Sequence, residues 1–476
     1  AANEVGQECE ARACESEYST LINEHANYFL LSEIDKNSGG IMSRQETYDD
    51  EIDRREYRRA RRKRNQLIAI IVVIVVGLAL VAGGILGVTR LMKHLNDKRH
   101  TEELQAQLEE LAESEPAVVE APVEELTADD YLNQIADTCI AEMSLENKVA
   151  GLFMITPESL TGVDTVIQAG DTTKQKLSEY PVGGLIYFSK NIKSADQLKE
   201  MLDTIRNTMI YPVFLAVDEE GGSVSRVAGA GLAENVGDMS AIGSSCDPEK
   251  AKEVGTTIGS YLSQLGFNVD FAPVADVASV ENSVIGNRSF GSDPNVVGTM
   301  VAAEVQGLQE SGVSACLKHF PGIGDTTTDT HDEKTVSEKT LEDMQQTDLP
   351  AFQEGIDAGA DFVMVSHMSL PNVVGDDTPC SLSGTVINDL LRNQLGYDGI
   401  VITDALDMSA ITDSYSSAEA AVKAIEAGAD MLLMPENFEE AYQGVLEAVQ
   451  NGTISEERIN ESLKRIYRVK YRDRIE

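Results

Sequence analysis

Short apolar runs alternate with longer amphipathic stretches through the larger, C-terminal part of the chain. Eight of these runs are rich in Val, Ile, Leu or Met, and they cover residues 149–155, 183–189, 213–217, 269–277, 314–320, 361–368, 399–405 and 430–435. Nearly continuous apolar runs are typical of parallel strands buried on both faces, and the segments between them are long enough for crossover helices. The pattern therefore predicts an α/β fold, a (β/α)8 TIM-type barrel over residues 129–476.

The last amphipathic stretch gives this barrel a closing helix. Asn451 and Gly452 precede Thr453, whose hydroxyl we expect to cap a helix over residues 454–472. Four apolar positions fall broadly on one stripe of that helix, namely Ile454, Ile459, Leu463 and Ile466. Such a stripe is typical of a helix that packs on a core.

Ahead of the barrel, residues 67–88 form a longer apolar run of 22 residues without a charge. A helix needs roughly 20 such residues to cross a hydrocarbon layer of ~30 Å. Eight Lys and Arg precede the run within residues 51–66, and four follow it within residues 90–100. This bias predicts one transmembrane helix over residues 67–89, with residues 1–66 in the cytoplasm and the barrel outside the cell membrane. A cleaved signal peptide is the alternative, although the run exceeds the roughly 7 to 15 apolar residues usual for one.

Two further segments flank the predicted membrane helix. Residues 90–128 are expected to form a helical stalk and an acidic linker, because residues 101–130 hold eleven acidic side chains and neither Lys nor Arg. Residues 1–41 show no clear periodicity and end just before Met42. Two interpretations of them stay open: a short disordered cytoplasmic tail, or residues outside the natural protein, which would then start at Met42.

The composition excludes one class of partner. The 80 Asp and Glu against 38 Lys and Arg give a formal net charge of −42, and residues 131–476 alone carry 54 acidic and 23 basic side chains. Such an anion repels phosphate backbones, so we expect no nucleic-acid partner. The six Cys are scattered singly and form neither a zinc-type cluster nor a disulfide framework, so we expect no metal and no cofactor.

Polar residues follow several of the predicted strands, where a barrel of this type places its site. They are Asp218, Glu219, Asp276, Lys318, His319, His367 and Asp404. Carboxylates and cations that converge on one barrel mouth suit the recognition of polyols and acid/base chemistry. In the loop after the fifth run, Asp329 could orient His331 for proton transfer near neutral pH. Taken singly, a strand-end Asp is often only a cap, and a loop His is often only solvated.

Four segments together resemble glycoside hydrolase family 3, and within it the single-barrel β-N-acetylglucosaminidases that act on peptidoglycan fragments. The segments are AVDEEGGSVSRV at 216–227, IGNRSFGSDP at 285–294, KHFPGIGDTTTDTH at 318–331 and VITDALDM at 401–408. The resemblance spans about 340 residues, and the motifs occur in the order typical of that family.

This resemblance implies a role for each matching residue. Asp404 matches the catalytic nucleophile, His331 the general acid/base and Asp329 its partner. The positions that bind the terminal N-acetylglucosamine are matched by Asp218, Arg226, Arg288, Lys318 and His319. Asp276 and His367 are expected to be structural, whereas Met408 either touches the sugar or packs in the core. Two positions depart from the family pattern, since Ile323 stands where His is frequent and Ser223 where Arg is frequent.

The expected function is that of a membrane-anchored exo-β-N-acetylglucosaminidase that trims non-reducing N-acetylglucosamine from peptidoglycan-derived saccharides. Its mechanism is expected to be retaining, with a His in place of the usual carboxylate acid/base. A glycoside phosphorylase is the alternative enzyme, because a His acid/base does not repel phosphate. A non-catalytic wall-binding module is the other alternative, and the presence of both Asp404 and His331 argues against it.

Overall fold

The computed structural model describes residues 127–280, 283–327 and 334–472. The predicted transmembrane helix, the stalk and most of the acidic linker lie outside the described residues. Within the described part, no helix is both long enough and apolar enough to cross a bilayer. The stretch Glu124–Glu476 forms one compact unit, which contains all of the described residues.

Eight parallel strands form one sheet in the order β10-β1-β2-β3-β6-β7-β8-β9. The strands are β1 (Phe153–Ile155), β2 (Gly184–Tyr187), β3 (Phe214–Val217), β6 (Val269–Asp270), β7 (Ser314–Phe320), β8 (Phe362–Val365), β9 (Ile400–Thr403) and β10 (Leu432–Leu433). A parallel bridge between Ile402 and Met431 joins the two ends of this order. The TIM-type barrel predicted from the eight apolar runs is thereby confirmed.

The predicted strand limits are too wide at several places. The run at 149–155 begins inside α5 (Leu145–Ala150), and the strand β6 covers only the first two residues of the run at 269–277. An apolar pattern cannot separate the buried end of a helix from the strand that follows it, because both are continuous hydrophobic runs.

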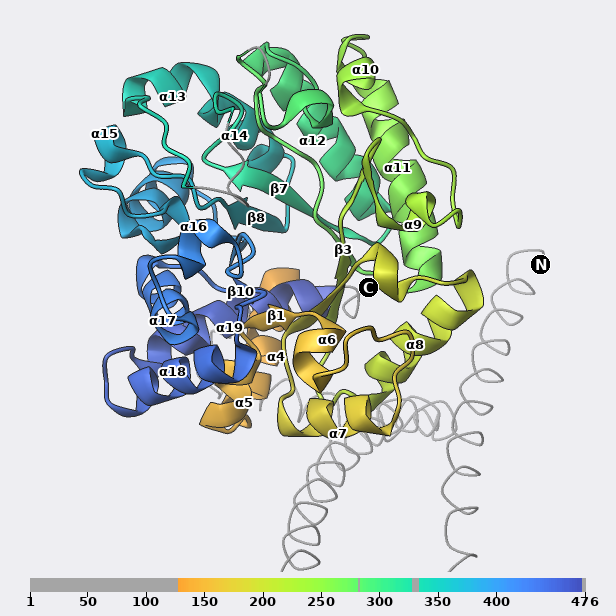
Figure 1. The fold of residues 1–476 in the computed structure, drawn as a ribbon, viewed down its shortest axis with the longest axis vertical. Helices are drawn as coiled ribbons and strands as arrows, with labels where there is room; N and C mark the ends of the chain where they lie inside the picture. Colours follow the sequence, from red (N-terminus) through yellow and green to blue (C-terminus); the bar gives the residue numbers. More distant parts are fainter. Residues whose placement is uncertain (1–126, 281–282, 328–333, 473–476) are drawn as a thin grey trace, which may run out of the picture. The chain divides into compact units, whose positions relative to one another are not determined.

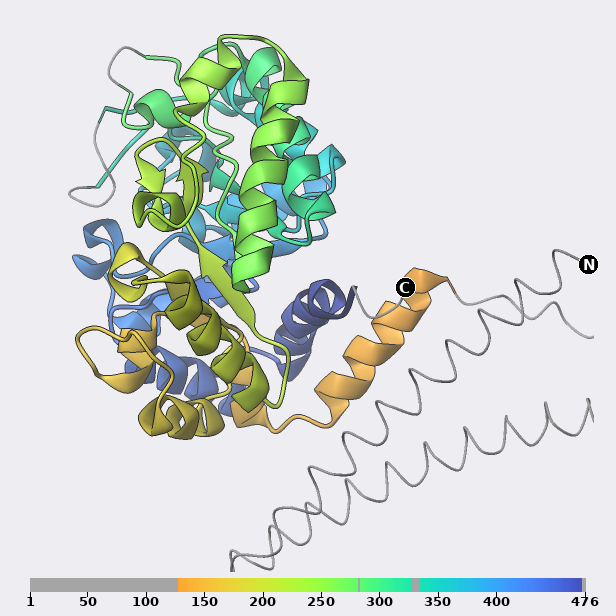
Figure 2. The same cartoon turned by 90° about the vertical axis from the view of Figure 1, so that its right-hand side faces the viewer.

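Helices surround the barrel and connect successive strands (Figures 1 and 2). The longer ones are α4 (Ala128–Ala141), α7 (Asp171–Glu179), α8 (Ala195–Thr208), α11 (Pro248–Leu265), α12 (Pro294–Glu310), α14 (Leu349–Asp357), the π-helix η4 (Thr385–Gln394), α17 (Ser417–Ala427), α18 (Phe438–Gln450) and α19 (Glu456–Tyr471). Short pieces near the strand ends are α6 (Pro157–Thr161), the 3-10 helix η1 (Ser189–Asn191), the hairpin of β4 (Glu219–Gly221) and β5 (Val224–Ser225), α9 (Arg226–Gly229), the 3-10 helix η2 (Gly286–Arg288) and α16 (Ser409–Thr412).

The last helix starts later than predicted. Its N-cap is Ser455, whose hydroxyl accepts a hydrogen bond from the backbone N–H of Arg458 at 3.2 Å. The hydroxyl of Thr453 instead donates to Asn451, in the turn that ends α18. The predicted stripe is confirmed, because Ile459 and Leu463 are fully buried.

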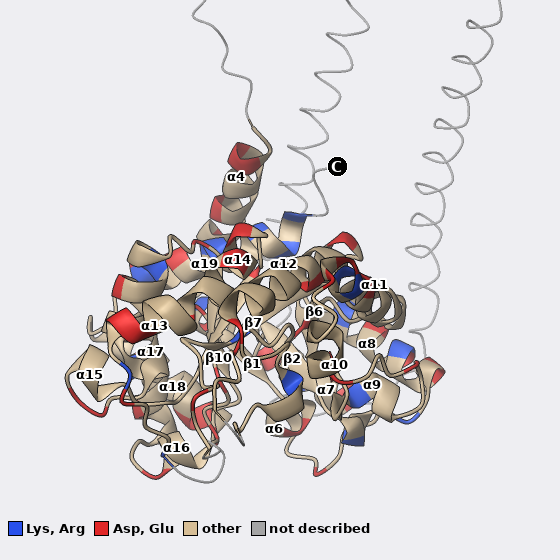
Figure 3. Ribbon diagram, turned by 90° about the horizontal axis from the view of Figure 1, so that it is seen from above, with Lys and Arg blue, Asp and Glu red and all other residues tan. Residues whose placement is uncertain are grey.

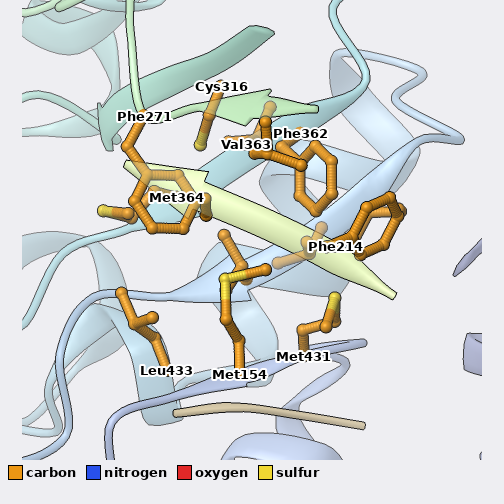
Figure 4. Packing of buried hydrophobic residues seen from close by; sticks show 14 of the residues in the cluster. Met154, Phe214, Phe271, Cys316, Phe362, Val363, Met364, Met431 and Leu433 are labelled. Carbon is orange, nitrogen blue, oxygen red and sulfur yellow. The ribbon is translucent and has the colours of Figure 1, made fainter. Parts of the chain in front are cut away.

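The barrel interior is filled by side chains from strands that are not neighbours in the sheet (Figure 4). The ring of Phe214 on β3 and the ring of Phe362 on β8 meet edge to face at 5.0 Å between centroids, across β6 and β7. Met154 and Cys316 contribute further buried side chains to the same core. The interior is therefore a packed core, as in other barrels of this size, and a pocket can form only at its ends.

The end of the domain where the strands begin is covered by α4 and α19, which lie side by side (Figures 2 and 3). Lys464 pairs with Asp137 at 3.0 Å between the two helices. Lys470 donates to the carbonyl oxygen of Gly183, just ahead of β2, at 2.8 Å. Figure 3 places α6 and α16 at the opposite end, and it shows acidic positions on helices all around the domain.

One buried carboxyl predicts how stability depends on pH. Glu304 on α12 is buried, and neither of its carboxylate oxygens has a hydrogen-bond partner among the described residues. Burial, with a smaller contribution from the negative charge of Glu220, raises the pKa of Glu304 to about 8. Between its ordinary pKa of 4.5 and about 8, the folded state keeps a proton that the unfolded state releases, so stability falls as pH rises.

We expect the substitution Glu304→Gln to remove the fall in stability that ionisation of Glu304 causes as the pH rises. The free energy of unfolding of the variant should exceed that of the wild type increasingly from pH 5 to pH 8.5, by on the order of a few kcal/mol at the upper end. Denaturant titration at a series of pH values measures the difference. Glu200→Gln, at an exposed position on α8, is the control. A difference that stays constant with pH would contradict the assignment.

Candidate active site

A pocket of about 360 Å³ opens at the ends of the strands opposite α4 and α19, and it is called the inner pocket below. Its charged lining residues are Asp218, Glu220, Arg226, Arg288, Lys318, His319, Asp404 and Asp407. Its apolar floor includes Phe271, Met364 and Leu433, which lie at one end of the packed interior in Figure 4. The arrangement suits a cyclic polar ligand. The charged side chains can form hydrogen bonds with polar groups at the edge of such a ligand, and its ring can pack on the apolar floor.

A wider pocket of about 620 Å³ adjoins the inner pocket and is called the outer pocket. The two share four lining residues, Phe188, Arg226, Asp407 and Met434. The outer pocket adds residues that follow β1, β2 and β10, namely Thr156, Ser159, Ser189, Lys190, Pro435 and Glu436. A ligand in the inner pocket could therefore extend outward without a clash with the barrel wall.

Asp404 lies directly after β9 and lines the inner pocket. Its Oδ1 accepts a hydrogen bond from the backbone N–H of Ala405 at 2.8 Å, and its own N–H donates to Val365 on the neighbouring strand at 2.9 Å. These contacts hold the carboxylate at the end of a strand, in the lining of the same pocket as Arg226, Arg288 and Lys318. The structure thus places Asp404, the predicted nucleophile, in the lining of the inner pocket.

Lys318 on β7 is the buried cation at the centre of the site. Its Nζ donates to Asp218 Oδ1 at 2.7 Å and pairs with Glu220 Oε1 at 2.6 Å. Burial would lower the pKa of the Lys318 ammonium, but the carboxylates of Asp218 and Glu220 outweigh it and raise this pKa above its usual value. Lys318 is therefore a fixed positive charge and not a proton donor at neutral pH.

His319 follows Lys318 through a cis peptide bond, and both side chains line the inner pocket. Asp276 Oδ2 accepts from the His319 backbone N–H at 3.0 Å and lies 2.7 Å from ring Nδ1. Arg288 Nη2 lies 3.4 Å from ring Nε2. Because a carboxylate only accepts and a guanidinium only donates, this network assigns the proton to Nδ1 and leaves Nε2 as the acceptor.

Arg226 and Phe188 form the wall shared by the two pockets. Arg226 begins α9, its guanidinium carbon lies 5.7 Å from the centre of the Phe188 ring, and its Nη2 lies 3.9 Å from Asp218 Oδ2. Its Nε is buried without a hydrogen-bond partner among the described residues. The rest of the guanidinium is partly exposed in the pocket wall, and its Nη2 lies beyond hydrogen-bond distance of Asp218, so Arg226 keeps donors that a ligand hydroxyl or carbonyl can use.

Sequence reasoning chose the wrong glutamate beside Asp218. Glu219, which was expected at the barrel mouth, is buried away from the pocket and accepts from the backbone N–H groups of Val227 and Ala228 at 2.7 and 2.9 Å. Glu220, which was not singled out, lines the pocket. The available signal was the strand periodicity of two, which puts Asp218 and Glu220 on one side and Glu219 on the other.

The remaining predicted positions are placed as follows. Asp276 and His367 are both fully buried, and the ring of His367 lies 2.7 Å from Ser381 Oγ and 2.8 Å from the carbonyl oxygen of Ala405. Met408 is buried, and it is its predecessor Asp407 that lines the pockets. Ile323 lines the inner pocket, Ser223 is exposed at the β4–β5 turn, and Asp329 and His331 lie outside the described residues.

A comparison with protein-family models decides the family. The model of the glycosyl hydrolase family 3 N terminal domain matches residues 144–469, which is most of the described unit. The chain belongs to glycosyl hydrolase family 3. The resemblance stated from the four motifs is confirmed, and the matched span coincides with the barrel.

Curated relatives of this family 3 chain are named beta-hexosaminidases. The enzyme of Stenotrophomonas maltophilia strain R551-3 is 36% identical over 272 residues, which are 56% of this chain and 80% of the relative. Beta-hexosaminidase A of Pseudoalteromonas piscicida is 32% identical over 323 residues, or 62% of this chain. The chain spans only about half, 54%, of the length of that second relative.

Solved family 3 structures share the barrel. A glycoside hydrolase family 3 beta-N-acetylglucosaminidase from Paenibacillus sp. FPU-7 is 36% identical, with a TM-score of 0.65 over 70% of this chain and 63% of that one. A glycosyl hydrolase of the family from Mycobacterium smegmatis is 31% identical, with a TM-score of 0.62 over 69% of this chain and 98% of that one. A beta-glucoside phosphorylase is 24% identical and shows likeness of fold alone.

The contacts of Asp276 predict a cost for removing its charge. Its two oxygens accept three N–H groups, since Oδ1 also accepts from the backbone of Ile323 at 2.8 Å. Asp276→Asn places an amide N–H₂ against a donor, so we expect a loss of roughly 1–3 kcal/mol in the free energy of unfolding. Thermal and denaturant unfolding measure it. Asp293→Asn at the N-cap of α12 is the control, because Asn caps as well as Asp does, and an equal effect of both variants would contradict the prediction.

Proposed function

We propose that this family 3 protein is a membrane-anchored, retaining exo-β-N-acetylglucosaminidase that removes terminal N-acetylglucosamine from peptidoglycan-derived saccharides. The observation that carries the proposal is the position of Asp404 on a strand end, facing Asp218 and the cations of the inner pocket. The names of the curated relatives and of the Paenibacillus structure support a β-linked N-acetylhexosamine as the glycone.

In this proposal, the inner pocket binds the terminal sugar. Asp218 accepts hydrogen bonds from its hydroxyls, and Arg226, Arg288 and Lys318 donate to it, because charge-assisted bonds of this kind are stronger than neutral ones. The apolar floor lies under the ring. The leaving saccharide extends into the outer pocket, whose Ser, Thr, Lys and Glu side chains offer donors and acceptors.

The proposed reaction has two displacement steps. The carboxylate of Asp404 attacks the anomeric carbon while His331 protonates the departing glycosidic oxygen, and a glycosyl-enzyme ester forms. His331 then takes a proton from water, the water oxygen attacks the anomeric carbon, and Asp404 leaves as a carboxylate. Asp329 orients His331 for both proton transfers. Two inversions give net retention of the β configuration.

A panel of aryl β-glycosides tests the reaction. We expect the N-acetylglucosaminide to be the best substrate, with the product first appearing as the β-anomer by NMR. Asp404→Asn should lower kcat by roughly three orders of magnitude or more, and His331→Ala should lower it chiefly for poor leaving groups. Asp413→Asn, an exposed carboxylate after α16, is the matched control. Near-normal turnover by Asp404→Asn would rule out the proposed nucleophile.

Phosphate separates the hydrolase from a phosphorylase. In the proposed hydrolase, added phosphate leaves the rate unchanged, and free N-acetylglucosamine accumulates. Formation of a sugar 1-phosphate in proportion to phosphate would instead establish phosphorolysis and overturn hydrolysis. Turnover of any glycoside argues against a purely wall-binding module.

The proposed location follows from residues 67–88, which the structure does not describe. We propose a single-pass protein with residues 1–66 in the cytoplasm and the barrel outside the cell. Native protein should then stay in the membrane fraction after washes with high salt and alkaline carbonate, and protease added to intact cells should remove the barrel. Full release by salt would contradict a spanning anchor.

A further inference from the structure

Two adjacent glutamates in the hairpin after β3 face different surroundings. Glu219 supports the start of α9 and lies 2.9 Å from the hydroxyl of Tyr261 on α11. Glu220 faces the barrel mouth, yet only 2% of its side chain is exposed. Its carboxylate is thus part of the site but offers little surface to a ligand.

Both oxygens of Glu220 are occupied by cations of the site. Oε2 accepts from Arg288 Nε at 2.7 Å, and Oε1 accepts from Arg288 Nη2 at 2.7 Å and pairs with Lys318 Nζ at 2.6 Å. The contact to Arg288 is a two-point, planar one, which fixes the direction of the guanidinium as well as its position. The same guanidinium lies 3.4 Å from His319.

We propose that Glu220 is a positioning residue, which holds Arg288 and Lys318 side by side so that both point their remaining donors at the bound sugar. This inference rests on the proposed function, because the ligand is taken to be the terminal N-acetylglucosamine. Glu220 does not itself contact the sugar; it acts through the two cations.

The need for such an anchor follows from the charges. Arg288 and Lys318 repel each other, and their nearness opposes the charged state of Lys318. Asp218 pairs with Lys318, whereas Glu220 pairs with both Lys318 and Arg288 and is therefore a carboxylate that the two cations share. Removing one member of a buried ion pair leaves an uncompensated charge, which must move or take up water.

Glu220 also keeps its own charge over the working range of pH. Burial alone would raise the pKa of its carboxyl, but Lys318 and Arg288 outweigh burial and lower the pKa to about 2. Near neutral pH the side chain is therefore ionised and accepts hydrogen bonds. A carboxylate that stays ionised there suits a fixed anchor and not a general base.

A double-mutant cycle on the full chain tests the proposal, with an aryl β-N-acetylglucosaminide as substrate. Glu220→Gln keeps the shape but turns one acceptor into a donor that faces the guanidinium, so kcat/KM should fall about 100-fold, as expected for a misplaced binding group. In an Arg288→Ala background, Glu220→Gln should lower kcat/KM by clearly less than 100-fold, because the guanidinium that Glu220 positions is already absent. Glu220→Asp, which keeps the charge, should recover part of the loss.

Glu304→Gln is the control, since it makes the same substitution at another buried glutamate, whose carboxylate oxygens have no hydrogen-bond partner among the described residues. We expect its kcat/KM to equal that of the wild type. Unfolding curves and the inhibition constant of free N-acetylglucosamine are measured for every variant. The proposal would be overturned by a Glu220→Gln variant that is less stable but has normal kcat/KM and normal product affinity per folded molecule. It would also be overturned if the double variant lost kcat/KM by the full product of the two single-variant factors. An inactive wild type would instead reject the proposed function.

Discussion

Closure of the barrel between β9 and β10 is the constraint on which the site depends. β10 has only two residues, and the join is completed by the buried carboxylate of Asp430, whose Oδ2 accepts from the backbone N–H of Val401 at 2.9 Å. Asp430 Oδ1 accepts from Ser462 on α19 at 2.7 Å, and Arg392 pairs with the same carboxylate. One side chain thus ties two strands to two helices. Without closure, the strand ends that carry Asp218, Lys318 and Asp404 would not meet at one mouth.

Within that mouth, charge is balanced at short range although the domain as a whole is strongly acidic. Lys318 pairs with the carboxylates of Asp218 and Glu220, and Arg288 pairs with Glu220 as well. Asp276 holds the imidazole ring of His319. Because these groups are held by one another in the structure without a ligand, the proposed sugar would require little reorganisation on binding. The apolar floor removes water on one side and strengthens each of these interactions.

The sequence allowed the barrel and much of the pocket to be predicted, because strand burial and strand-end polarity are local patterns. The limits of the strands were harder, since α5 ends in the same apolar run in which β1 begins. Glu220 was missed because its role depends on Arg288, which is 68 residues away in the chain. The helix cap moved from Thr453 to Ser455 because the preceding Asn451 competes for the threonine hydroxyl. Arg288, the partner that gives Glu220 its role, thus lies in a distant segment, whereas the strand limit and the helix cap depend on competition between neighbouring residues.

The route by which the chain enters the domain has a consequence for access. Helix α4, the first described element, packs along α19 beside the starts of the strands, at the end of the domain opposite α6 and α16 (Figure 3). The residues that line the two pockets follow the other ends of the strands. The described chain therefore begins at the end of the barrel away from the two pockets.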